Sequence, residues 1–270
     1  MLDFSEPQLM GILNVTPDSF SDGGRFVEPS CAVAQARQMV AEGASIIDIG
    51  GESTRPGAQA VAVEDELHRV LPVIQALRAS GLAATISIDT CKPEVMRAAV
   101  AAGAGIINDV YALRQPGALE AAAELNVPVC LMHMQGEPRT MQAAPHYDDV
   151  VAEVRDFLLA RVEACLAAGI ARHNIILDPG FGFGKTVAHN LVLLKHLPVL
   201  CALGYPVLVG LSRKSMLGAL LNTSVEERLY GTVALTTIAV AAGARVIRVH
   251  DVRANRDAMR VAMAVQAASA

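Results

Sequence analysis

A chain of 270 residues that is 53% hydrophobic, only 4% aromatic and without Trp can bury a large core of small aliphatic side chains. Its formal net charge of −5 argues against general affinity for nucleic acid, which requires a basic face, but allows a local cationic site. We find no signal peptide, no apolar run long enough to span a membrane and no CxxC pair among the five cysteines, so we expect a cytoplasmic protein with reduced thiols.

Short apolar segments alternate with segments of helical periodicity along the whole chain. The expected strands are residues 9–13, 46–50, 85–88, 106–107, 129–132, 175–177, 207–211 and 246–249. The expected helices are roughly residues 30–43, 63–80, 93–102, 117–126, 148–168, 189–200, 225–243 and 254–267. Helix ends support this assignment, because glycines, which C-terminal caps prefer, follow helical segments at Gly43, Gly81, Gly103, Gly169 and Gly243.

This alternation predicts a single α/β domain over residues 1–270, since no linker or break in composition interrupts it. Eight βα units favour closure of a parallel sheet into a (β/α)8 TIM barrel, for which about 250 residues is typical. An open doubly wound sheet is the alternative if one strand is miscounted. In both folds the active site lies at the carboxyl ends of the strands.

Polar side chains end the third, fourth and sixth expected strands, at Asp89, Asn108 and Asp178. Two carboxylates and an amide in a barrel mouth offer acceptors and donors for a polar heterocycle with an N–H edge. Any one of these residues alone is more often a helix N-cap. Because three of them end neighbouring strands, we favour a binding site.

The glycine-rich segment 178–186 follows a strand and superficially resembles a phosphate-binding loop. Pro179 stands where a Walker A loop needs Gly, and Lys185 stands where a dinucleotide-binding loop needs Gly. Glycines that alternate with phenylalanines, including Phe183, instead suggest close backbone approach to a flat ligand beside aromatic rings. A plain tight turn is the alternative.

Cationic side chains end the last two strands, in the segment 212–215 (Ser-Arg-Lys-Ser) and at Arg248 and His250. Barrels often bind phosphate at these two loops, although a solvated charge cluster is the alternative. Arg248 lies within an apolar strand and needs a partner, but as a rim charge it should contribute little to stability, so alanine there should spare the fold. No transition-metal ligand set is present, and His133 is expected to be a structural rim histidine.

The ordered motifs together resemble the dihydropteroate synthase family, almost from end to end. They are residues 14–24 (NVTPDSFSDGG), 51–57 (GESTRPG), 88–90 (IDT) with 92–93 (KP), 108–110 (NDV), 132–135 (MHMQ), 178–185 (DPGFGFGK), 212–215 (SRKS) and 248–251 (RVHD). This family has a (β/α)8 barrel and is the target of sulfonamides. It joins p-aminobenzoate to 6-hydroxymethyl-7,8-dihydropterin diphosphate and releases pyrophosphate.

The resemblance implies a role for each matching residue. Asp89, Asn108, Asp178 and Lys214 should hold the pterin. Asn14, Arg248 and His250 should hold the diphosphate, with Asn14 as a ligand of Mg²⁺, and Val249 should bind substrate. Asp89, Lys214, Arg248 and His250 should take part in catalysis. Thr54, Arg55, Pro56, Phe183 and Ser215 should frame the p-aminobenzoate pocket. The C-terminal helices, including the uncharged segment 229–244, should form a homodimer interface.

The reaction that the resemblance implies is SN1-like, with diphosphate leaving before the arylamine attacks. One departure is visible, since many members have a further N-terminal strand before the segment equivalent to residues 2–8. Either the start of this chain is trimmed or the barrel floor is covered otherwise. Two alternatives remain. A folate-binding methyltransferase domain would not need the first long loop or the 212–215 segment, and a silent pterin-binding paralogue would bind without turnover.

Overall fold

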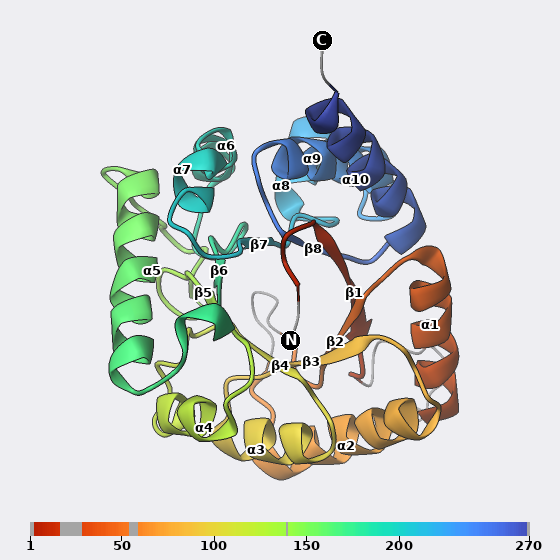
Figure 1. The fold of residues 1–270 in the computed structure, drawn as a ribbon. Coiled ribbons are helices and arrows are strands. Elements are labelled where there is room, and N and C mark those ends of the chain that lie inside the picture. The colour runs from red at the N-terminus through yellow and green to blue at the C-terminus, as the bar shows by residue number, and fades with distance from the viewer. Residues whose placement is uncertain (1–2, 17–28, 54–58, 139, 269–270) are drawn as a thin grey trace.

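In a computed structural model, which describes residues 3–16, 29–53, 59–138 and 140–268, eight parallel strands are surrounded by helices (Figure 1). The strands are β1 (Gln8–Asn14), β2 (Ile46–Gly50), β3 (Thr85–Asp89), β4 (Ile106–Asp109), β5 (Val129–Met132), β6 (Ile175–Asp178), β7 (Leu208–Val209) and β8 (Val246–Val249). The helices are α1 (Pro29–Glu42), α2 (Val63–Ala79), α3 (Pro93–Ala101), α4 (Ala118–Leu125), α5 (Val150–Ala167), α6 (Val187–Lys195), α7 (Leu197–Cys201), α8 (Ser215–Leu221), α9 (Leu229–Ala241) and α10 (Val252–Ala267).

The sheet is a nearly closed barrel. Its strand order is β6-β5-β4-β3-β2-β1-β8-β7, so the first strand pairs with the last one, which an open doubly wound sheet does not do. The remaining seam is bridged where Leu177 pairs in parallel with Val207 and donates its backbone N–H to Pro206 over 2.9 Å. The prediction of a single (β/α)8 barrel is therefore confirmed, and the alternative sheet is excluded.

Hydrophobic residues fill the barrel in two layers. The larger core lies between strands and helices, and a smaller interior cluster contains Met10, Ile46, Ile106, Cys130, Ile176, Leu208 and Val246. The half-buried ring of Phe4, just before β1, packs against this interior cluster. Phe4 thus provides cover for the barrel interior ahead of the first strand.

The helices between residues 187 and 241 differ most from the sequence prediction. The helix expected over 189–200 is two helices, because Pro198 lacks the N–H that a continuous helix needs and instead lies in the first turn of α7. The helix expected over 225–243 begins only at Leu229. Helix α8 was missed, since a short apolar segment with Gly218 in it has no readable amphipathic period.

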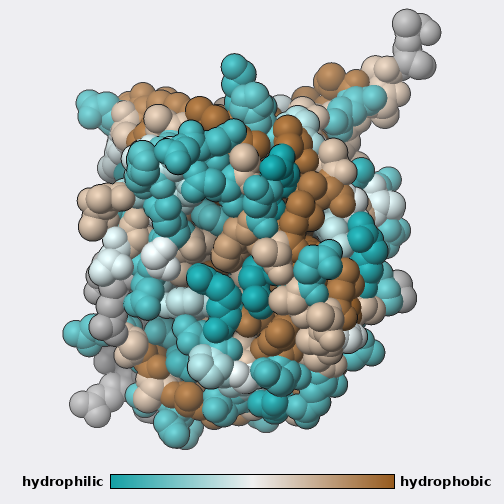
Figure 2. Space-filling view, turned by 90° about the vertical axis from the view of Figure 1, so that its left-hand side faces the viewer, coloured by the Kyte–Doolittle hydropathy of each residue, from teal (hydrophilic) through white to brown (hydrophobic). Residues whose placement is uncertain are grey.

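The outer surface is mixed in character. On the side that α5 covers, hydrophilic residues predominate and hydrophobic ones lie between them in short strips (Figure 2). Among the described residues, no helix has the length and apolar character needed to cross a membrane. The predicted glycine caps are confirmed, since a glycine with positive φ lies within two residues of the end of each of five helices, at Gly43, Gly81, Gly103, Gly169 and Gly243.

Candidate active site

A pocket opens at the carboxyl ends of the strands, where the sequence analysis expects a site. It is lined by Asp89, Asn108, Val110, Met132, Asp178, Gly180, Phe181, Phe183, Gly210, Lys214 and Arg248. Most of these residues lie at or just beyond the ends of β3, β4, β5, β6, β7 and β8, so the closed barrel brings together groups that are far apart in the sequence. Four predicted pterin-binding residues, Asp89, Asn108, Asp178 and Lys214, share this pocket.

Arg248 connects the polar groups of the pocket across the barrel. Its Nε donates to Asp48 Oδ2 over 2.6 Å, and its Nη2 donates to Asp89 Oδ2 over 2.8 Å. Asn108 Nδ2 donates to the same oxygen of Asp48 over 3.1 Å. The expectation that Arg248 is a weakly coupled rim charge is wrong, because the side chain is only 22% exposed and its partner Asp48 is completely buried. The charge of Arg248 therefore compensates a carboxylate that has no access to water.

Asp48 bonds two residues of the pocket, Arg248 and Asn108, and the sequence analysis missed this role. Asp48 lies in the middle of β2, between isoleucines, and unlike Asp89 or Asp178 it does not stand at the end of its strand. The signal that could have found it is the apolar strand itself, because a charge in a buried strand requires a partner of opposite charge. Arg248, in the equally apolar β8, is that partner.

The carboxyl groups of the pocket are difficult to ionise. Burial raises the pKa of Asp89 to about 7, an effect that Arg248 opposes and the nearby Asp48 adds to. Burial also raises the pKa of Asp178 to about 6, against the hydrogen bond from the Gly180 N–H and the charge of Lys214. Carboxyl groups with these pKa values titrate close to neutral pH, as groups in ligand sites often do.

The glycine-rich loop after β6 is fixed by its own side chains. Asp178 Oδ1 accepts the N–H of Gly180 over 2.7 Å, and Lys185 Nζ donates to the carbonyls of Gly180 and Phe183 over 2.9 and 3.0 Å. Lys185 Nζ also contacts His133 Nδ1 over 2.9 Å. Burial lowers the pKa of Lys185 to about 7 and that of His133 to about 2, so the imidazole is neutral. The prediction of a structural histidine at position 133 fits this contact.

Lys214 lies against the aromatic ring of Phe183. Its Nζ is 4.2 Å from the ring centroid, and burial, reinforced by the charge of Arg248, lowers its pKa to about 8. Ser215 follows Lys214 as the exposed first residue of α8. Lys214 and Phe183 therefore form one wall of the pocket, which combines a cation with a flat apolar surface.

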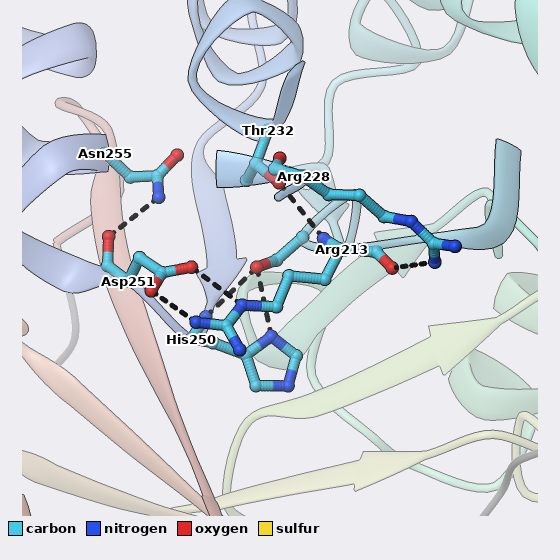
Figure 3. A network of polar contacts seen from close by, with 7 residues as sticks. Arg213, Arg228, Thr232, His250, Asp251 and Asn255 are labelled. Atoms are coloured by element: carbon cyan, nitrogen blue, oxygen red, sulfur yellow. Dashed lines mark hydrogen bonds and ion pairs between the residues drawn. The ribbon is translucent and has the colours of Figure 1, made fainter. Parts of the chain in front are cut away.

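His250 stands at the end of β8 and is held by the neighbouring loop. Its backbone N–H donates to Ser212 Oγ over 3.2 Å, and its Nδ1 lies 3.0 Å from the same oxygen (Figure 3). Val249, predicted to bind substrate, is 1% exposed and packs into the hydrophobic core. A ligand would therefore meet the backbone of Val249 rather than its side chain.

Asn14 ends β1 on the same side of the barrel. Its Oδ1 and the Oδ2 of Asp89 each lie 3.7 Å from the position that a Cβ atom on Gly50 would occupy. Among the described residues, no group of three or more His, Cys, Asp or Glu side chains is arranged to hold a metal ion. A neutral amide oxygen beside carboxylates suits a hard cation that takes most of its ligands from a phosphate group, as Mg²⁺ does.

The second long loop, between β2 and α2, is held by an ion pair at its start and by a hydrogen bond at its end. Lys92 bonds the carboxylates of both Glu52 and the fully buried Glu66. Glu52 Oε1 in turn accepts the backbone N–H of Val61 over 3.2 Å, which ties the two ends of the loop together. The predicted residues Thr54, Arg55 and Pro56 lie between these anchors, outside the described residues.

Known pterin-binding enzymes are similar to this chain over most of its length. The family model for "Pterin binding enzyme" matches residues 10–250. The dihydropteroate synthase of Escherichia coli (strain K12) is 55% identical over 99% of this chain and 94% of its own length. The Haemophilus influenzae dihydropteroate synthase is 55% identical over 96% of this chain and 94% of its own length.

Solved structures of such enzymes superimpose closely. The Yersinia pestis dihydropteroate synthase, in a sulfonamide drug complex, has a TM-score of 0.94 and 52% identity, with coverage of 99% of this chain and 97% of that one. The Xanthomonas albilineans dihydropteroate synthase with 4-aminobenzoic acid has a TM-score of 0.93 and 58% identity, with coverage of 99% and 96%. The similarity thus spans the whole barrel and its loops, and the chain belongs to the dihydropteroate synthase family of pterin-binding enzymes.

Proposed function

We propose that the pocket at the end of the barrel binds the pterin ring of 6-hydroxymethyl-7,8-dihydropterin diphosphate and presents its methylene carbon to p-aminobenzoate. The chain is a transferase that makes dihydropteroate, as its family relationship indicates. One observation carries the assignment of residues, namely that Asp89, Asn108, Asp178 and Lys214 line a single pocket beside the ring of Phe183.

The polar groups of the pocket match a flat heterocycle with several N–H donors. Asp178 and Asp89 supply carboxylate acceptors, and Asn108 supplies an amide. Lys214 supplies a cation that bonds ring acceptors, and Phe183 excludes water from one side. A ligand N–H that replaces water around these carboxylates gains a charge-assisted hydrogen bond, which is stronger than one between neutral groups.

Arg248 and His250 are the proposed partners of the diphosphate. Two guanidinium nitrogens of Arg248 bind Asp48 and Asp89, whereas Nη1 has no hydrogen-bond partner in the described part of the chain. Arg248 therefore has a donor left for a phosphate oxygen, and the buried carboxylates fix its orientation beforehand. His250 offers a second donor at the neighbouring loop.

Asn14 is the proposed protein ligand of Mg²⁺, which would take its remaining ligands from the diphosphate and water. When bound, the ion would neutralise part of the charge on the diphosphate. Because the described residues include no carboxylate cage, we expect the ion to bind with the substrate rather than to the free protein.

The proposed reaction is a substitution at the pterin methylene carbon. The C–O bond breaks first, and pyrophosphate leaves with the bonding electron pair toward Arg248 and His250. The carboxylates of Asp89 and Asp178 then face the electron-poor pterin and stabilise it. The arylamine nitrogen forms the new C–N bond and loses a proton to solvent. Since an arylamine is a weak nucleophile, its orientation in the pocket contributes more than a strong base would.

The p-aminobenzoate pocket is proposed to lie beside Phe183 and Ser215, and the resemblance assigns Thr54, Arg55 and Pro56, which lie outside the described residues, to the same pocket. Lys92 pairs with Glu52, which precedes these three residues, and with Glu66 in α2, which follows them. The Xanthomonas albilineans relative has been crystallised with 4-aminobenzoic acid and also with 7,8-dihydropteroate, which supports both ligands as members of one reaction.

A homodimer in the cytoplasm is the proposed state of the enzyme. Helices α9 and α10 pack side by side and expose apolar side chains, with Tyr230 84%, Ile238 50%, Val261 60% and Val265 72% exposed. Such a surface is typical of a protein–protein interface. Light scattering should give twice the chain mass for the wild type, and an Ile238→Glu variant should be monomeric. A monomeric wild type would contradict the dimer.

The reaction is tested by pyrophosphate release from the pterin diphosphate, with and without p-aminobenzoate, in the presence of Mg²⁺. We expect release coupled to dihydropteroate when both substrates are present. Release without p-aminobenzoate would support early departure of the diphosphate. Pterin binding with no release under any condition would instead indicate a silent pterin-binding protein.

A further inference from the structure

Ser212 and His250 form a contact that the reaction described above does not use. Ser212 lies just beyond β7 and is 6% exposed, and its Oγ meets two nitrogens of His250. The backbone N–H of His250 donates to this oxygen over 3.2 Å, while Nδ1 of the ring lies 3.0 Å away. One buried hydroxyl thus serves both the backbone and the ring of the same residue.

The hydrogen-bonding capacity of a hydroxyl decides how the ring is protonated. Ser212 has one hydrogen to donate and two lone pairs to accept with. The backbone N–H of His250 can only donate, so it occupies one lone pair. In the described part of the chain, Nδ1 is the acceptor within reach of the hydroxyl hydrogen. If Nδ1 carried a proton, two donors would face one oxygen, and the buried hydroxyl hydrogen would be left without a partner, which is unfavourable.

We infer that Ser212 is a positioning residue that holds His250 in the tautomer with its proton on Nε2, so that the ring donates a hydrogen bond to the diphosphate. This inference deepens the proposed function and rests on it for the identity of the acceptor. A neutral imidazole has one donor nitrogen, and the neighbour of the other nitrogen selects which one it is. Without Ser212, some of the molecules would have the proton on Nδ1. In those molecules Nε2 has no hydrogen and cannot donate to the diphosphate.

The two loops that carry Ser212 and His250 are fixed next to this contact (Figure 3). Arg213 follows Ser212, and Asp251 follows His250. Arg213 Nε and Nη2 bond the two carboxylate oxygens of Asp251 over 3.0 and 2.6 Å. A two-point pair of this kind constrains orientation as well as distance.

Helices α9 and α10 complete this support. Thr232 Oγ1 accepts the backbone N–H of Arg213 over 3.1 Å, and Asn255 Nδ2 donates to the carbonyl of Asp251 over 2.7 Å. Arg213 has a left-handed φ of +56°, a conformation that L-residues adopt at a cost and that surrounding bonds must maintain. The Ser212–His250 contact is thus part of a fixed framework rather than of a mobile surface.

Nitrogen NMR on the protein with ¹⁵N-labelled histidine tests the tautomer directly. The chain has seven histidines, and the signals of His250 are those that a His250→Gln variant lacks. At about pH 8.5, well above the ordinary histidine pKa of ~6.5, we expect a protonated Nε2 and an unprotonated Nδ1 in the free wild type. A Ser212→Ala variant should show a mixture, and Ser212→Thr, which keeps the hydroxyl, should restore the single form. A proton on Nδ1 in the wild type would overturn the inference, whether or not the variants fold.

Kinetics separate this role from a general effect on the fold. Ser212→Ala should slow pyrophosphate release about tenfold while the KM for p-aminobenzoate stays the same. A glutamine side chain at position 250 can donate a hydrogen bond but has no tautomers. Adding Ser212→Ala to the His250→Gln variant should therefore not slow pyrophosphate release further. An equal loss in both backgrounds would overturn the inference. Failure of the wild type to release pyrophosphate would overturn the proposed function, and the NMR result would still decide the tautomer.

Discussion

Arg248 on β8 donates from Nε to the carboxylate of Asp48 on β2 over 2.6 Å, a bond between residues 200 positions apart in the sequence. Asp48 is completely buried, and among the described residues its Oδ1 has no hydrogen-bond partner. Because the charge of Arg248 compensates this buried carboxylate, Arg248 has a structural role as well as a functional one.

We predict that Arg248→Met destabilises the protein by about 3–5 kcal/mol, because methionine leaves the buried carboxylate of Asp48 unpaired. Urea unfolding followed by circular dichroism measures this loss. As a matched control, Asp48→Asn combined with Arg248→Met should recover part of the stability, since the double variant buries no unpaired charge. If Arg248→Met has the wild-type free energy of unfolding, Arg248 does not stabilise the fold and acts only in ligand binding.

The barrel could be predicted from the sequence because the features that indicate its strands and helix ends are local and recur in each βα unit. The strands are apolar on both faces, and glycines such as Gly43 and Gly243 mark helix ends through the positive φ that they adopt. Asp89, Asn108 and Asp178 were found because each ends a strand. By contrast, the pairing of Arg248 with Asp48 could not be read from the sequence, since it depends on how strands close across the barrel.

The buried partners of Lys185 and Glu66 could not be predicted from the sequence either. Lys185 looked like part of a failed phosphate-loop motif, yet its Nζ contacts two carbonyls within its own loop and two atoms of His133 on the loop after β5. Glu66 lies in the acidic first turn of α2, a pattern typical of exposed residues, although it is completely buried against Lys92. Both roles depend on long-range packing, for which a single sequence has no periodic signal.

Pterin affinity should depend on the ionisation of Asp89. Burial raises the pKa of Asp89 to about 7. The charged form is the better acceptor for ring N–H groups, so affinity should rise as pH increases through 7 and level off about one unit above. Isothermal titration with a pterin ligand between pH 6 and 8.5 measures this trend.

Asp89→Asn should weaken pterin binding about tenfold or more at pH 8 and should flatten the part of the pH trend that Asp89 causes. Asp257→Asn is the control, because that carboxylate is 60% exposed on α10, and it should bind as the wild type does. If Asp89→Asn has unchanged pterin affinity and an unchanged rate of reaction, Asp89 does not bind the pterin.

Lys92→Met should destabilise the protein by about 3 kcal/mol, because it leaves Glu66 as an unpaired buried charge. It should also raise the KM for p-aminobenzoate, since Glu52 loses its partner at the end of the second loop. Chemical unfolding and steady-state kinetics measure the two effects separately.

The control for Lys92 is the exposed pair Arg97–Glu124, with side chains 43% and 62% exposed. Arg97→Met should cost less than about 1 kcal/mol, as exposed pairs usually do. Combining Glu66→Gln with Lys92→Met should restore stability but not the KM, because Glu52 is still unpaired. Recovery of both would show that Glu52 does not fix the loop.

Gly180 and Gly81 allow backbone strain to be separated from a steric clash, because both have a φ of +68°. A Cβ at Gly180 would lie 1.9 Å from the carbonyl oxygen of His133, whereas a Cβ at Gly81 would meet no atom within 4 Å. Gly81→Ala should therefore cost only the strain of a left-handed residue, about 1–2 kcal/mol. Gly180→Ala should cost at least about 2 kcal/mol more, since the backbone around His133 must move. It should also weaken pterin binding, because Gly180 lines the pocket. Equal free energies of unfolding for the two variants would mean that the backbone around Gly180 moves aside at no cost. The contact between the loop after β6 and the loop after β5 would then not make the pocket wall rigid.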